Sequence, residues 1–202
     1  MTTVEVFAEI TCPFAYIGLQ HVVEHIAELD RPVDVIVRAW PLEWVNGTGL
    51  AVDGVQTKAL ALRDQLGVDK FSGLRTDRWP NTTIPALALE AAAYDNDPST
   101  GLAVASELRT ALFENGIDVS HHDELARIAA EHGVEFDVED DSAVHADHEA
   151  GEVRGVIGSP HYFVGDDDFF CPALDLGRDA DDHLIARFDP AGLGRFLERL
   201  AR

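Results

Sequence analysis

Five residues near the start of the chain indicate how it folds: Cys12-Pro13-Phe14-Ala15-Tyr16. They follow a strand-like run over residues 4–10 and open a helix-like run that reaches Leu29. A cysteine that begins a helix lies among unpaired backbone N–H groups and at the positive end of the helix dipole, and both favour the thiolate. Pro13 suits the first helical position, because the N–H that it lacks would have no partner there. The pattern predicts a nucleophilic Cys12 with a lowered pKa; the alternative is a small, buried and inert cysteine.

The composition is that of a globular protein with a strongly acidic surface. The 202 residues are 46% hydrophobic, and 15 basic side chains stand against 37 acidic ones, for a net charge of −22. Such a surface repels phosphate backbones and anionic membranes, so we expect no nucleic-acid or membrane partner. The sequence has no leader-like start and no run of about 20 apolar residues. We therefore expect a cytoplasmic protein whose two cysteines remain thiols.

Strand signals lie toward both ends of the chain, and helical signals fill its middle. Residues 33–39 alternate like a second strand. Strands return at residues 161–164 and 169–171, with a predicted four-residue turn between them, and a last helix begins after Asp189. The helices expected in the middle of the chain cover residues 57–66, 84–94, 101–115, 123–132 and 144–156.

A second motif lies far downstream, at Gly158-Ser159-Pro160-His161-Tyr162-Phe163-Val164. Together with residues 11–18, it resembles the DsbA-like branch of the thioredoxin superfamily. That branch includes FrnE-type oxidoreductases, kappa-class glutathione transferases and 2-hydroxychromene-2-carboxylate isomerase. The resemblance implies an α/β, thioredoxin-like fold: residues 1–52 and 151–202 would form the thioredoxin-like domain, and residues 53–150 an inserted helical domain.

Ala15 is a departure from the redox members of this family, which carry Cys-x-x-Cys. The resolving cysteine would stand at position 15, so Cys12 cannot close the usual four-residue disulfide. The transferase and isomerase branches have a motif similar to Ser-Pro-x-x at this place and use an activated hydroxyl or bound glutathione. The chain therefore keeps the nucleophilic cysteine of the redox members but lacks their resolving cysteine.

The downstream motif resembles the cis-proline loop of the family. The resemblance implies that the Ser159–Pro160 peptide bond is cis, faces Cys12 and offers its backbone to an extended thiol-bearing substrate. The alternative is a trans proline that ends a helix, since cis bonds are a minority among X–Pro bonds. His161, beside this proline, is expected to carry a proton or to contact substrate.

The first helical turn is expected to border the site through Pro13, Phe14 and Tyr16. Both aromatic rings could equally belong to the core, and the Tyr16 hydroxyl could lie near the sulfur. No metal site is expected, because His21 and His25 lack the spacing of the metalloprotease motif and the other histidines lie among surface acids.

The predicted hairpin places the second cysteine. A four-residue turn at 165–168 pairs Tyr162 with Cys171, which puts Cys171 two strands from Cys12, about 10 Å away. That separation is too large for a disulfide without movement. The segment 169–175 also resembles the place where kappa-class transferases hold the glutamyl end of glutathione. Cys171 and Asp175 are therefore expected to line a ligand site, with a resolving role for Cys171 as the alternative.

Three functions remain open. In the first, the Cys12 thiolate forms a mixed disulfide with a thiol- or disulfide-bearing protein or small molecule, and glutathione or mycothiol resolves it as a co-substrate. No permanently bound cofactor is needed. In the second, the protein is a glutathione-dependent transferase or isomerase, and Cys12 orients the bound thiol. In the third, it is a catalytically inactive binding module. A homodimer is compatible with each of them.

Overall fold

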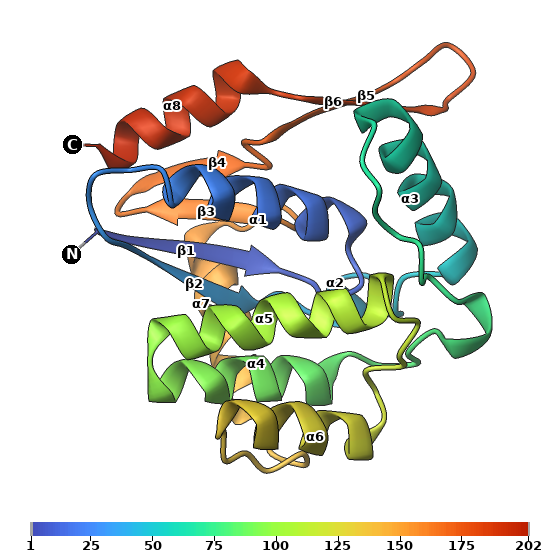
Figure 1. Cartoon of the computed structure of the whole chain (residues 1–202), viewed down its shortest axis with the longest axis vertical. Helices are drawn as coiled ribbons and strands as arrows, with labels where there is room; N and C mark the ends of the chain where they lie inside the picture. Colours follow the sequence, from blue (N-terminus) through green and yellow to red (C-terminus); the bar gives the residue numbers. More distant parts are fainter. Residues whose placement is uncertain (1, 202) are drawn as a thin grey trace.

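A computed structural model describes residues 2–201 (Figure 1). A four-stranded sheet has the order β2-β1-β3-β4, and a separate two-stranded sheet pairs β5 with β6. Strand β2 is parallel to β1, whereas β3 is antiparallel to both β1 and β4. The elements in chain order are β1 (Thr2–Ala8), α1 (Pro13–Ile26), β2 (Val33–Ala39), α2 (Leu42–Val45), α3 (Val52–Leu66), the 3₁₀ helix η1 (Thr76–Arg78), α4 (Ile84–Asn96), α5 (Pro98–Phe113), α6 (His122–His132), α7 (Ser142–Arg154), β3 (His161–Val164), β4 (Asp167–Phe170), β5 (Leu174–Arg178), β6 (Leu184–Phe188) and α8 (Pro190–Leu200).

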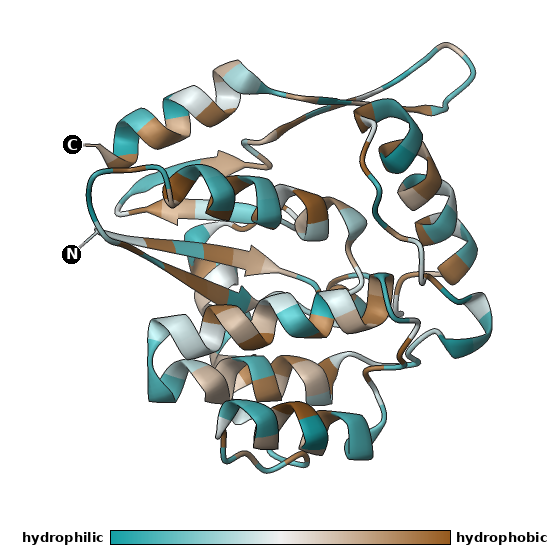
Figure 2. Cartoon of the chain, viewed as in Figure 1, coloured by the Kyte–Doolittle hydropathy of each residue, from teal (hydrophilic) through white to brown (hydrophobic). Residues whose placement is uncertain are grey.

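Helices cover both faces of the four-stranded sheet. Figure 1 shows α1 in front of the sheet and α7 behind it. On the first face, Val6 belongs to one buried cluster with Leu19 of α1 and Phe196 of α8. On the second face, Gly151 of α7 approaches the Trp40 ring so closely that a Cβ would lie 2.5 Å from it. Strands covered on both faces are expected to be mostly apolar. Figure 2 shows β1 and β2 as mainly hydrophobic, although Glu5, Asp34 and Arg38 interrupt the apolar runs.

The chain between β2 and β3 is helical, as expected. Helix α4 packs along α5, and both contact β2. Asp97 begins α5, and its side chain accepts hydrogen bonds from the N–H groups of Ser99 (2.9 Å) and Thr100 (3.0 Å). The bounds differ from the prediction by a few residues: α1 ends at Ile26, and α3 begins at Val52. None of the helices within residues 2–201 is long and apolar enough to cross a bilayer.

The predicted register of the β3–β4 hairpin is wrong. Its turn has two residues, so that Val164 pairs with Asp167 and Tyr162 pairs with Phe169. Gly165 has φ +63° and occupies the first turn position, where a two-residue hairpin turn with a single positive φ places glycine. Cys171 consequently lies beyond the end of β4, not opposite Tyr162.

Candidate active site

Cys12 is the residue that caps the N-terminus of α1. Its carbonyl accepts the Tyr16 N–H at 3.1 Å, which starts the helix. Its side chain is only 4% exposed, and Sγ donates a hydrogen bond to the backbone carbonyl of Ser159 at 3.2 Å. The two motifs that are far apart in sequence therefore meet at the sulfur.

The Ser159–Pro160 peptide bond is cis, which confirms the prediction and excludes the trans alternative. The Ser159 hydroxyl oxygen accepts the Glu9 N–H at 2.8 Å. The Pro160 carbonyl accepts the Cys171 N–H at 3.1 Å. The cis-proline loop is thus held between residues 9–12, which join β1 to α1, on one side and Cys171 on the other.

Burial raises the pKa of the Cys12 thiol above its ordinary value. The backbone amides of Ala15 and Phe14 and the contact with Ser159 act in the opposite direction, as expected at a helix start, but they are outweighed. The predicted lowering of this pKa is therefore wrong for the resting protein. A sulfur that donates to a carbonyl carries its proton, so Cys12 rests as a thiol.

Cys171 is also a free, buried thiol. Burial, together with the nearby Cys12 sulfur, raises its pKa to about 12. Its backbone has φ +47°, a left-handed conformation that is uncommon outside glycine. A thiol so resistant to ionisation is a poor nucleophile. These properties favour the ligand-lining interpretation of Cys171 over the resolving one.

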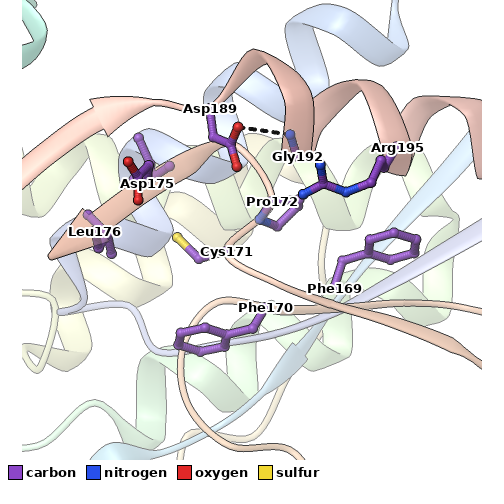
Figure 3. Close-up of a pocket in the computed structure, with 10 residues that line it drawn as sticks. Phe169, Phe170, Cys171, Pro172, Asp175, Leu176, Asp189, Gly192 and Arg195 are labelled. Carbon is purple, nitrogen blue, oxygen red and sulfur yellow. Dashed lines mark hydrogen bonds between the residues drawn. The ribbon is translucent and has the colours of Figure 1, made fainter.

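Two cavities adjoin Cys171. The larger, of about 720 Å³, lies between α3, the cis-proline loop and the β5–β6 hairpin, and Phe14, Ser159 and Cys171 line it. The smaller, of about 360 Å³, lies beside α8 and contains Asp175. Figure 3 shows the Cys171 side chain between Phe170 and Asp175 in this smaller cavity, with Arg195 farther toward α8. Cys171 therefore forms part of the wall of both cavities.

The larger cavity carries positive charge in an otherwise acidic protein. Lys58, one of only two lysines, lines it with its ammonium 5.9 Å from the centroid of the Phe14 ring. Lys58 forms no ion pair with any acid within residues 2–201. Arg178 also lines the cavity and pairs with Asp182 at 3.3 Å. Neither cation was predicted to lie at the site, because Lys58 and Arg178 come together only when the β5–β6 hairpin folds back over α3.

One side chain of α3 forms hydrogen bonds with the backbone of that hairpin. The Gln65 amide nitrogen donates to the Leu184 carbonyl at 2.8 Å, and the Gln65 carbonyl oxygen accepts the Ala186 N–H at 2.7 Å. Gln65 thereby pairs with the backbone of β6 as a neighbouring strand would. It fixes one wall of the larger cavity.

Tyr16 lies away from both cavities. Its ring stacks on Phe113 and meets Phe71 edge-on, at centroid distances of 5.1 and 5.5 Å. Its hydroxyl donates to Glu114 at 2.9 Å, and burial, with that carboxylate, raises its pKa to about 12. Tyr16 is a core aromatic whose hydroxyl is bound to Glu114 and not to the sulfur. Pro13 is buried in the same helical turn.

His161 faces away from Cys12. Its neighbour Tyr162 shares a buried cluster with Cys12, and successive strand residues point to opposite faces. The ring of His161 bonds to Asp168 at 3.0 Å and accepts the Ile157 N–H at 3.4 Å. These contacts join β4 to the loop before the cis-proline and give no support to a proton-carrying role at the sulfur.

The chain belongs to the DsbA-like thioredoxin domain family, whose model matches residues 3–180. The expected thioredoxin-like fold is thus confirmed. Comparison with curated proteins finds no match.

Several solved structures share the fold at low identity. A 2-hydroxychromene-2-carboxylate isomerase is 14% identical with a TM-score of 0.61, over 83% of this chain and 88% of that one. The cytosolic disulfide reductase DsbM from Pseudomonas aeruginosa is 14% identical with a TM-score of 0.61, over 99% and 98% of the two chains. The same reductase with GSH gives the same identity and TM-score, over 99% of each chain.

Proposed function

We propose that the protein is a thiol–disulfide oxidoreductase that acts through the single thiol of Cys12. The contact between Sγ and the Ser159 carbonyl carries this proposal, because it joins a helix-capping cysteine to the backbone of a cis-proline loop beside a cavity. Membership of the DsbA-like family and the likeness to a disulfide reductase support it.

The reaction begins when substrate takes the place of the thiol at Ser159. A backbone N–H of an extended substrate would donate to the Ser159 carbonyl and release the Cys12 S–H from it. The amides of Phe14 and Ala15, which already favour the anion, then stabilise the thiolate. Binding therefore activates a sulfur that is protected at rest.

Two exchanges complete the cycle. The Cys12 thiolate attacks one sulfur of the substrate disulfide; an Sγ–S bond forms, the substrate S–S bond breaks, and the leaving thiolate takes up a proton. The thiolate of a small external thiol then attacks the substrate sulfur of this mixed disulfide and releases Cys12. The net change is the exchange of one thiol for another in the substrate disulfide, with no permanently bound cofactor.

The co-substrate that we favour is glutathione, with mycothiol as the alternative. Lys58 and Arg178 in the larger cavity suit the carboxylates of glutathione, and the related reductase has been solved with GSH. A cytoplasmic location, expected from the sequence, would keep such a thiol reduced. The disulfide-bearing partner would be a protein or a small molecule.

The smaller cavity favours a second candidate function, a glutathione-dependent transferase or isomerase. Asp175 and Arg195 offer opposite charges to the amino and carboxylate groups of a glutamyl end. The likeness to a 2-hydroxychromene-2-carboxylate isomerase is compatible with this chemistry. In that case Cys12 would orient the bound thiol without forming a covalent adduct.

Intact-mass measurement after incubation with oxidised glutathione distinguishes the two candidates. We expect one glutathione on the wild type and on Cys171→Ser, and none on Cys12→Ser, because only Cys12 can become an activated thiolate. Reduction should restore the original mass. An adduct that persists in Cys12→Ser and disappears in Cys171→Ser would show that Cys171, and not Cys12, is the reacting sulfur. The absence of an adduct on every form would favour the transferase or isomerase.

A further inference from the structure

A buried acid lies three residues before the reacting cysteine. Glu9 follows β1, is only 1% exposed, and has no part in the exchange steps above. Burial raises the pKa of its carboxyl group, while backbone hydrogen bonds from Thr11 and Leu42 act against that shift. A buried carboxylate is costly unless its hydrogen bonds are made, so its presence calls for a role.

The hydrogen bonds of Glu9 reach three segments near the sulfur. One carboxylate oxygen accepts the Thr11 N–H at 3.1 Å, within the loop that carries Cys12. The other accepts the Leu42 N–H at 2.9 Å, at the start of α2. The backbone N–H of Glu9 donates to the Ser159 hydroxyl at 2.8 Å, and its carbonyl accepts the Cys12 N–H at 3.4 Å.

The charge of Glu9 also acts on the sulfur. It raises the pKa of Cys12, but its effect is weaker than that of burial and than that of the hydrogen bonds with Ala15, Ser159 and Phe14. The other charged groups that interact with Glu9 are Glu90 of α4 and Arg109 of α5, which form a fully buried ion pair with each other. Because the opposite charges of Glu90 and Arg109 lie together, the pair adds little net charge beside Glu9.

We propose that Glu9 is a positioning residue of the thiol site: its carboxyl group fixes the loop before Cys12 against α2, and its backbone N–H holds the cis-proline loop at Ser159. When it is ionised, Glu9 also disfavours the Cys12 thiolate. The inference rests on the proposed role of Cys12 as the reacting thiol. The role of Glu9 helps to explain why Cys12, although it begins a helix, is an unreactive thiol in the resting protein.

The test is the pH profile of Cys12 alkylation by iodoacetamide, followed by peptide mass. Glu9→Gln removes the charge and keeps one carbonyl acceptor, so we expect the pKa of Cys12 to fall by about one pH unit. Asp147→Asn is the matched control, since Asp147 is also a buried acid that accepts a backbone N–H, from Ala39 at 2.9 Å, but it is not among the groups that shift the pKa of Cys12. A Glu9→Gln profile that coincides with the wild type, or moves upward, would overturn the electrostatic part of the proposal.

Glu9→Asp tests the positioning part and remains informative if Glu9→Gln fails to fold. This variant keeps the charge but is too short to reach both Thr11 and Leu42. We expect alkylation of Cys12 to accelerate several-fold at every pH, with no fall in its pKa, because the loop is released while the charge stays. A rate equal to that of the wild type would overturn the proposal. Neither measurement uses a disulfide substrate, so its failure is distinct from failure of the glutathione adduct.

Discussion

Burial raises the pKa of both cysteines, and this couples their titration to folding. An unfolded cysteine titrates near 8.5, whereas Cys171 titrates at about 12 in the folded chain. The folded state therefore binds a proton more tightly than the unfolded state does. The resulting stabilisation is fully present below pH 8.5 and is lost as the pH rises toward 12.

Alkaline unfolding should reveal this coupling. Over this window the free energy of unfolding should fall by about 1.4 kcal/mol per pH unit for each such thiol. Cys171→Ser should reduce the slope by that amount, because serine does not titrate. Urea unfolding followed by circular dichroism between pH 8 and 11 measures both slopes. Equal slopes for the wild type and the variant would contradict a buried, neutral Cys171.

The first turn of α1 already has the geometry of a dithiol site. Ala15 is completely buried, and its N–H is directed at Cys12. Position 15 is also one helical turn from the capping cysteine, where a second sulfur would face the first. The site therefore lacks only the side chain of a resolving cysteine, whereas the start of the helix already provides the position for it.

Ala15→Cys should create a Cys-x-x-Cys site. We expect mild oxidation to yield a form with two fewer hydrogens, and the reduced form to gain activity in a protein-disulfide reduction assay. Overpacking at this buried position should cost about 1–3 kcal/mol of stability. Ala15→Ser is the control of similar size without the sulfur. If the variant stays reduced under diamide, the helix start is not arranged for a dithiol.

The elements that the sequence predicted well are those with local signals. Strand β2 was predicted at residues 33–39, where apolar side chains alternate, and α4 begins as expected at Ile84 beside a proline. The β3–β4 turn failed because Gly165 is followed by three aspartates, which suit a turn of two or of four residues equally well. Because of this register error of two residues, Cys171 was predicted within the second strand of the hairpin, whereas it lies beyond the end of β4.

The sequence allowed the two motifs of the site to be predicted, but not the burial and the hydrogen bonds that surround Cys12. Cys12 and Ser159–Pro160 meet as the resemblance implied. The raised pKa of Cys12 could not be foreseen, because burial depends on the cover supplied by distant segments. Glu9 was missed for the same reason: its partners at Leu42 and Ser159 lie 33 and 150 residues away in the chain.

The whole molecule combines a buried ion pair with a strongly negative surface. Glu90 and Arg109 are each 1% exposed, and several of their polar atoms have no partner within the described chain. Such a pair is poor support for stability. Outside it, a net charge of −22 repels itself and favours expansion. Stability should therefore depend on the ionic strength.

Added salt should stabilise the protein. The Debye length falls from about 10 Å at 0.1 M to about 3 Å at 1 M, so surface acids repel one another less. We expect Tm to rise by several degrees from low salt to 1 M KCl, most steeply below about 0.15 M. Sucrose at matched osmolality controls for excluded-solute effects. A flat or falling Tm would mean that surface repulsion does not limit stability.

The separate β5–β6 sheet bears on how this lineage can diverge. The hairpin lines the larger cavity, yet its strand pairing is not shared with the four-stranded sheet. Gln65 binds main-chain atoms of β6, so this tether does not depend on the side chains of the strand. Leu174 and Ala186 are buried in the core, but the exposed positions of the hairpin can change without disturbing the thiol or the cis-proline loop. After gene duplication, paralogues should diverge first in substrate specificity and only later in the reaction that they catalyse.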